Sequence, residues 1–436
     1  MLSWSKHDVK NKRAFDKPRL TKKKIFTMAS IRERFEIPGK MKTWSLALIG
    51  IGLVAFIIGL VTKGMSKDEH ERAIFLGTLM YNTIYWTLVC NAAMFFICAT
   101  TMAWGGWQIS FRRVTEAIST MVPIFGSITF VVLIYVVFIG KNHDIYHWLS
   151  EEAKTDPILK GKLGFLNPTF FFIWTTLAIG LWALLGWRIR KLSNEADEAA
   201  MNGVSGAAFI KQNTVRAATF LVWFGLTVGS TVPWLWMMSI DAHWYSTMYS
   251  WYNFASTFVA GMSLIALWVV YLKNKGYLEY TNQEHLHDIG KFMFAFSIFW
   301  TYLWFSQYML IWYSNQPEET IYFKHRVQGP YKGIFFLNLI INFICPILIL
   351  MKRAAKRNYT LITFMAVLII FGHWIDYYQQ VMGSISKDHV TLGWFDFGIL
   401  SLFVGLMIFF VSKSLASKPL IPKYHPFLKE SIVHHT

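Results

Sequence analysis

The sequence has 436 residues, of which 54% are hydrophobic, 17% aromatic and 15% charged. One soluble core could not bury so much apolar surface, so the composition excludes a soluble globular protein and indicates a membrane protein. The formal net charge of +17 does not indicate binding to nucleic acid, because the basic residues lie in a terminal tail and short connections rather than on a folded basic face.

Residues 1–42 form a strongly basic segment that precedes the first apolar run. They lack the short apolar core and small-residue cleavage site of a signal peptide. We therefore expect a solvated cytoplasmic arm that contacts anionic lipid.

Ten apolar segments between residues 43 and 413 are each long enough to cross a bilayer as a helix, with residues 414–436 following as a C-terminal tail. The sequence thus predicts one all-α transmembrane domain of about ten helices. Pro123 and Pro233 are candidate helix breaks in the first half, and no paired break is evident in the second. The predicted spans are 43–63, 74–104, 114–139, 168–187, 217–238, 249–272, 292–313, 333–351, 359–381 and 393–412.

The distribution of Lys and Arg predicts the orientation. Connections on the same side as the two ends of the chain are slightly richer in basic residues than the other connections, and the two tails add strongly to that side. By the positive-inside rule, both termini are expected in the cytoplasm.

The chain supplies no evident redox centre. Cys90, Cys98 and Cys345 lie inside apolar runs without haem-attachment or iron-sulfur spacing. A membrane haem would need paired axial histidines, and His373 is the one histidine deep in a predicted span. We therefore expect no cofactor held by this chain, and any redox role must be shared with partners.

Ionisable side chains inside a bilayer are costly and so carry a functional hypothesis. His373 and Asp376 lie three residues apart, a spacing that places both on one face of the ninth span. A proton relay or a contact with quinol is one interpretation. The alternative is structural, with His373 and Asp376 as a satisfied pair and the other acids as helix caps. The candidates expected toward the outer half are Asp376, Asp396, Asp241, His373, His243 and His147.

Glu116 lies at the inner end of the third span, four residues after Arg112 and three after Arg113. This spacing favours a local ion pair. An inward-facing entry point for protons is the alternative.

Three stretches resemble the NrfD-like family, which is named for membrane subunits of polysulfide and nitrite reductases. They are MSIDAHWYST (238–247), LKNKGYLEYTN (272–282) and HDIGKFMFAFSIFWTYLWFSQYMLIWY (287–313). Within the family, the sequence is most similar to the second NrfD-like subunits of bacterial alternative complex III. The resemblance runs from about residue 43 to the C-terminus.

The resemblance implies two four-helix bundles, spans two to five and six to nine, flanked by the first and tenth helices. It also implies a subunit of a quinol:cytochrome c oxidoreductase in the bacterial inner membrane, with menaquinone or another quinol as a possible ligand. Expected partners are a sister NrfD-like subunit, an iron-sulfur subunit, haem c subunits (cytochromes c), small membrane subunits and a haem-copper oxidase, besides lipid.

Under this resemblance, Asp241, His243, His373 and Asp376 are the positions expected to support quinol oxidation and proton translocation. Two other classes stay open. One is a scaffold subunit without a site of its own, and the other is a proton-coupled secondary transporter.

Overall fold

The computed structural model describes residues 34–423 and 425–435, so most of the predicted basic arm lies outside the described residues. The described chain is helical and contains no β-strand beyond one isolated bridge between Arg34 and Pro419. The predicted all-α class is confirmed.

Helices account for every predicted span, although their bounds differ by several residues. The first begins at Gly39 rather than at residue 43, and the last continues to Ala416. The main helices are α2 (Gly39–Gly59), α3 (Glu69–Met102), α4 (Arg112–Ser119), α5 (Met121–Ile134), α7 (Pro168–Met201), α8 (Ile210–Leu226), α9 (Val232–Trp236), α10 (Tyr249–Asn274), α11 (Gln283–Ser314), α13 (Lys332–Leu339), α14 (Cys345–Leu350), α16 (Tyr359–Ile385) and α17 (Trp394–Ala416).

Nine helical stretches among the described residues are long and apolar enough to cross a membrane, so the chain is an all-α integral membrane protein. The remaining predicted span, 292–313, is the seventh in the chain and falls on α11, a helix of 32 residues that is not among the nine. Its Trp, Tyr, Ser and Gln residues dilute the apolar character that the other spans have.

Two groups of helices pack around a shared centre. In one group α3 contacts α5 and α8, and α7 contacts both of these in turn. In the other group α10 contacts α11 and α16, while α13 and α14 close the group against α16 and α11. The two groups meet where α3 contacts α10 and α16, and α2 packs along α17. These contacts match the expected pair of four-helix bundles with two flanking helices.

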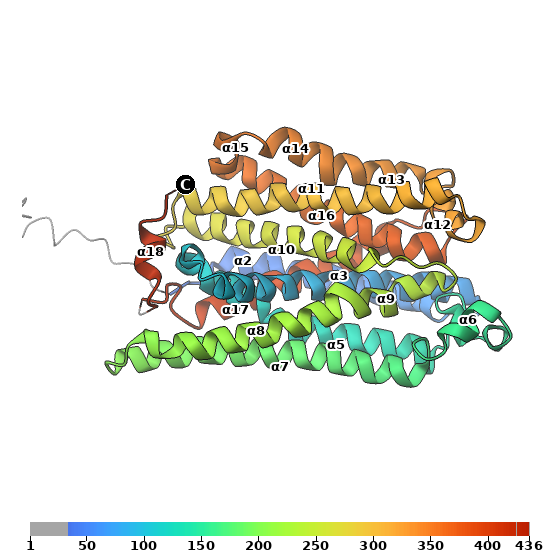
Figure 1. Cartoon of the computed structure of the whole chain (residues 1–436), viewed down its shortest axis with the longest axis horizontal. Coiled ribbons are helices and arrows are strands. Elements are labelled where there is room, and N and C mark those ends of the chain that lie inside the picture. Colours follow the sequence, from blue (N-terminus) through green and yellow to red (C-terminus); the bar gives the residue numbers. More distant parts are fainter. Residues whose placement is uncertain (1–33, 424, 436) are drawn as a thin grey trace, which may run out of the picture. The chain divides into compact units, whose positions relative to one another are not determined.

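Figure 1 shows the long helices lying side by side, with α7 and α8 along one edge and α11, α13 and α14 along the other. Short α18 (Leu428–Ile432) lies at one end of the helices, here called the tail end. Short α6 (Pro157–Lys162) and α12 (Pro317–Val327) lie at the opposite end, here called the loop end.

Two spans contain a π-helical turn just before a proline. Thr227–Thr231 precedes Pro233, and Ile340–Ile344 precedes Pro346. Proline cannot donate a backbone hydrogen bond, and a π-turn absorbs the resulting misfit without unwinding the helix. The second of these breaks was not predicted, because Pro346 is surrounded by an unbroken apolar run. Pro123 lies near the start of α5, where proline is tolerated, and is not accompanied by a π-turn.

Candidate functional site

Asp376 lies on α16 with 1% of its surface exposed and receives hydrogen bonds from two neighbouring helices and from its own. The Tyr252 hydroxyl donates to one carboxylate oxygen. The indole Nε1 of Trp300 donates to the other at 3.3 Å, and Nε2 of Gln380 donates to the same oxygen at 3.2 Å. The carboxylate is therefore held by side chains of α10, α11 and its own helix.

His373 lies one turn before Asp376 and is fully buried. Ser256 connects the two, because its Oγ lies 2.9 Å from Nδ1 of His373 and donates to Asp376 at 3.4 Å. The His373 Nε2 has no hydrogen-bond partner among the described residues. We call Asp376, His373, Ser256, Tyr252 and Trp300 the Asp376 cluster.

A small cavity adjoins the Asp376 cluster on the side of the loop end. Its volume of about 30 Å³ has room for one or two water molecules. Several of the lining groups are polar and could hold such waters. The lining residues are Tyr249, Tyr252, Trp304, Gln307, Tyr322, Phe323, Arg326, Phe335, Asp376, Gln379 and Gln380.

Arg326 continues the polar path from this cavity toward the loop end. It is 4% exposed, and its Nη2 donates to Oγ of Ser384 at 2.7 Å and to the carbonyl of Gln380 at 3.3 Å. The same nitrogen lies 3.8 Å from Asp241, whose other oxygen is 3.3 Å from Nζ of Lys387. A chain of polar groups thus leads from Asp376 to Asp241.

Tyr322 supports Arg326 through its ring. The guanidinium lies 3.5 Å from the centre of the Tyr322 ring, which stacks at 3.8 Å on Trp244. Burial raises the pKa of Tyr322 to about 12, although Arg326 acts in the opposite direction. The phenol is therefore neutral at physiological pH.

His243 and His147 lie at the loop end, outside the Asp376 cluster. Nε2 of His243 is 2.6 Å from Oδ2 of Asp156, which also caps the N-terminus of α6. The hydrogen bond from His243 is the main reason that the pKa of Asp156 is lowered. The ring of His147 lies 6.3 Å from that of His243. Asp156 was not predicted as the partner.

Asp396 occupies a third, separate position. It accepts hydrogen bonds from the backbone of Gly393 at 2.9 Å, from Tyr81 at 2.9 Å and from Thr78 at 3.1 Å. These contacts cap α17 and fix its start against α3. They correspond to the capping alternative considered above.

Glu116 forms the ion pairs expected from its spacing, at the tail end. Its oxygens lie 2.9 Å from Nε of Arg112 and 2.6 Å from Nη1 of Arg113. Arg113 also pairs with Asp197 on α7, a partner that the spacing did not reveal. The six outer candidates and Glu116 therefore occupy several distinct places rather than one site.

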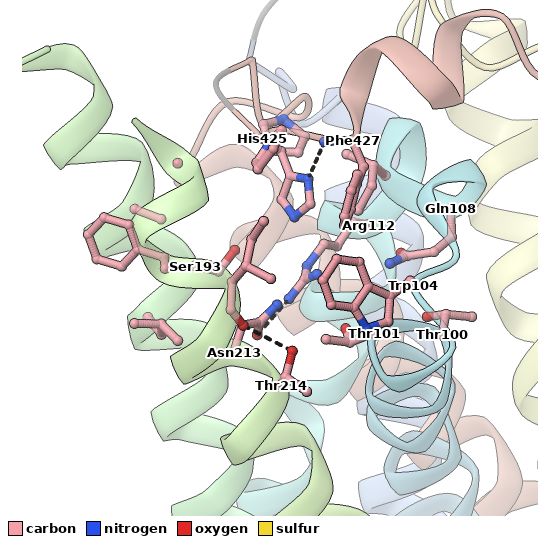
Figure 2. A pocket seen from close by; sticks show the side chains of 18 of the residues that line it. Thr100, Thr101, Trp104, Gln108, Arg112, Ser193, Asn213, Thr214, His425 and Phe427 are labelled. Atoms are coloured by element: carbon pink, nitrogen blue, oxygen red, sulfur yellow. Dashed lines mark hydrogen bonds between the residues drawn. The ribbon is translucent and has the colours of Figure 1, made fainter. Parts of the chain in front are cut away.

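A pocket of about 50 Å³ opens beside Arg112 at the tail end (Figure 2). Figure 2 shows that Arg112 and Asn213 meet between α8 and the end of α3. His425, from the C-terminal segment, lies above Arg112 at the top of this view. Arg112 is already paired with Glu116, and burial lowers the pKa of His425 to about 3. This pocket therefore offers mostly neutral polar groups, which suit water better than an anion.

Tyr252, Ser256, Trp300 and Gln380 were not among the predicted site residues. The sequence did contain part of the information. Tyr252 and Ser256 are four residues apart, as are Asp376 and Gln380, so each pair shares a helical face. Which helices face one another is not encoded in such local spacing.

Among the described residues, no three His, Cys, Asp or Glu side chains gather closely enough to hold a metal ion. The fold defines a multi-pass α-helical integral membrane protein. The Asp376 cluster is a polar centre buried among its helices, and it contains the His373 and Asp376 pair that the spacing predicted. No protein-family model matches the sequence, and no curated protein matches it.

Proposed function

We propose that the chain is an NrfD-like membrane subunit of a quinol-oxidising respiratory complex of the alternative complex III type, and that it carries protons through the Asp376 cluster. The resemblance of residues 238–247, 272–282 and 287–313 supports the family. The buried Asp376, hydrogen-bonded on several sides and linked to His373 through Ser256, is the observation that carries the proton role.

Oxidation of a quinol to a quinone releases two electrons and two protons. The electrons require redox centres, and iron-sulfur and haem c subunits would supply these. The protons require groups that accept and release them, and a carboxylate beside a water-sized cavity, linked to an imidazole through Ser256, has this property. Under the expected topology the loop end faces away from the cytoplasm, so the path past Arg326 to Asp241 would discharge protons there.

A quinol ring does not fit beside Asp376 in this structure. The adjoining cavity holds about 30 Å³, whereas sites for small organic ligands span roughly 300–1,000 Å³. A groove of about 750 Å³ between α2, α10, α16 and α17 is large enough, but the described residues that line it include no Asp, Glu or His. We therefore assign quinol oxidation itself to the sister subunit and proton transfer to this chain.

The test uses the assembled complex carrying Asp376→Asn or His373→Gln. We expect quinol turnover or the number of protons released per electron to fall, because each change removes a group that accepts and returns a proton. Asp144→Asn is the control, since Asp144 is an exposed acid near the loop end. Unchanged turnover and unchanged proton release in both variants would contradict the proton role and leave the scaffold function.

Proton-coupled transport of a solute is a second candidate. The π-turns before Pro233 and Pro346 favour it, because they disturb the regular backbone hydrogen bonding of one helix in each bundle, and transporters bind substrates at paired irregular helices. Solute uptake by the purified chain alone in liposomes would support this function. Absence of uptake together with activity in the complex would exclude it.

A further inference from the structure

A basic cavity of about 340 Å³ opens at the tail end between α4, α7 and the segment that follows α17. It lies far along the helices from the Asp376 cluster and does not depend on the proposed function. Four cations and one acid, Glu116, line it, together with one indole and several small or apolar side chains. The residues that the argument uses are Arg113, Arg190, Lys191, Lys418, Trp187 and Leu415.

The charges in this cavity are only partly balanced by the protein. Glu116 and Asp197 pair with Arg113, and Glu195 comes within 3.7 Å of Lys191. Arg190 donates instead to the backbone carbonyl and hydroxyl of Ser119, at 3.2 and 3.1 Å. Within the described part of the chain, neither Arg190 nor Lys418 has an ion-pair partner.

The cavity also lies at the depth where lipid headgroups would be. The apolar part of α7 ends at Trp187, which is 51% exposed, and Arg188, Arg190 and Lys191 follow directly. Tryptophan is enriched at the level of the headgroups, and basic pockets between transmembrane helices bind anionic lipid heads. Nζ of Lys191 lies 5.2 Å from the centre of the Trp187 ring, so the ring and the cation form one edge of the cavity.

We propose that this basic cavity binds the phosphate of an anionic phospholipid, with Arg190 and Lys418 as its principal cations. A phospholipid head and a soluble phosphate ester would present the same phosphate group to these cations. The lipid is the source we commit to, because the cavity combines unpaired cations with an interfacial indole and the apolar Leu415. A soluble phosphate ester would need only the cations.

The experiment measures lipid binding to the full-length protein in detergent by native mass spectrometry. The probes are phosphatidylglycerol and phosphatidylcholine with identical acyl chains. We expect the unmodified protein to bind at least one phosphatidylglycerol in preference to phosphatidylcholine. Lys418→Gln should weaken that binding about fivefold, and Lys418→Gln with Arg190→Gln about 25-fold, as expected for the loss of one or two cations near a charged lipid.

Two controls separate charge from structure. Arg190→Lys keeps the charge and should retain most of the binding, even though it alters the hydrogen bonds to Ser119. Lys160→Gln with Lys332→Gln removes two exposed cations at the loop end and should leave the first binding event unchanged. Folding of each variant is checked by its elution profile in gel filtration.

The outcomes decide between the sources of phosphate. Unchanged preference for phosphatidylglycerol in the Lys418→Gln variant and in the folded double variant would overturn the proposal. Displacement of the lipid by glycerol phosphate at equal concentration would overturn the assignment to lipid in favour of a soluble ester. The proposal would be supported if the double variant lost its preference for phosphatidylglycerol while Arg190→Lys and the loop-end control kept theirs.

Discussion

The indole Nε1 of Trp374 donates a hydrogen bond to Oδ1 of Asn82 at a distance of 2.8 Å. Both side chains are fully buried, and they belong to α16 and α3. The bond therefore joins the two helix bundles. It also fixes the residue next to His373, so it helps to position the Asp376 cluster.

Replacing Asn82 with Leu should destabilise the protein by about 1–3 kcal/mol, because the Trp374 donor would be buried without an acceptor. Unfolding in mixed detergent micelles, monitored by circular dichroism, measures this free energy.

Asn91 provides a matched control on the same helix. It is also fully buried, but neither of its side-chain polar atoms has a partner among the described residues. Asn91→Leu should therefore cost little or stabilise the protein. If both substitutions lowered the free energy of unfolding equally, the hydrogen bond to Trp374 would not be the cause of the destabilisation.

These two asparagines also show how far the sequence could predict the structure. Apolar segment lengths predicted the helices, since lipid imposes a minimum length on each span. Segment length does not say which polar residues within them bond between helices, and Asn82 and Asn338 do so, with Trp374 and Gln379. Asn91 makes no such bond among the described residues.

The sites were less predictable than the spans. Spacing along one helix predicted that Glu116 would pair with Arg112 and Arg113, and that His373 and Asp376 would share a face. The partners from other helices could not be predicted, because they depend on how the helices pack. Arg326 is the clearest case, since it lies in a connection by sequence but is buried against α16.

The stability of the C-terminal segment should depend on pH through His425. Burial lowers its pKa from about 6.5 to about 3, so between these values the unfolded chain binds a proton that the folded chain does not. Stability therefore falls as the pH drops below 6.5, by up to about 1.4 kcal/mol per pH unit.

His425→Gln should remove this part of the pH dependence. The check compares thermal unfolding midpoints from pH 7.5 to pH 5 for the variant and the unmodified protein. His435→Gln is the control, because His435 is exposed. A pH profile of His425→Gln that follows the unmodified protein would refute the assignment.

Ser431 should anchor α18 to the tail end of the helices. Its buried Oγ donates to the carbonyl of Trp107 at 2.6 Å, accepts from the amide of Ser110 at 3.1 Å and lies 3.1 Å from Nε2 of His285. Ser431→Ala leaves these groups without their partner, so local opening should become about tenfold more frequent.

Hydrogen exchange in the C-terminal segment measures that opening. Ser417→Ala is the matched control, because among the described residues the exposed Ser417 hydroxyl bonds to the nearby carbonyl of Ser414 alone. Exchange that rises equally in both variants would mean that Ser431 has no special role.

The attachment of α2 to α17 should depend on Gly52. A Cβ at this position would lie 2.4 Å from Cβ and 2.7 Å from Cα of Leu402, so the two helices touch through backbone. Small residues allow this close approach in membranes, where dispersion contacts replace the hydrophobic effect. The rest of α2 has mostly exposed apolar side chains, which leaves this seam as its main attachment.

Gly52→Ala should therefore lower the free energy of unfolding by about 1–3 kcal/mol, since the added methyl forces the helices apart. Gly50 lies on the same helix, and a Cβ added there would have no neighbouring atom within 4 Å. Gly50→Ala should instead stabilise α2 by about 0.5–1 kcal/mol through its better helix propensity. Thermal unfolding and protease sensitivity of α2 measure both effects. If both substitutions raised the free energy of unfolding, helix propensity and not contact with Leu402 would govern this part of the protein.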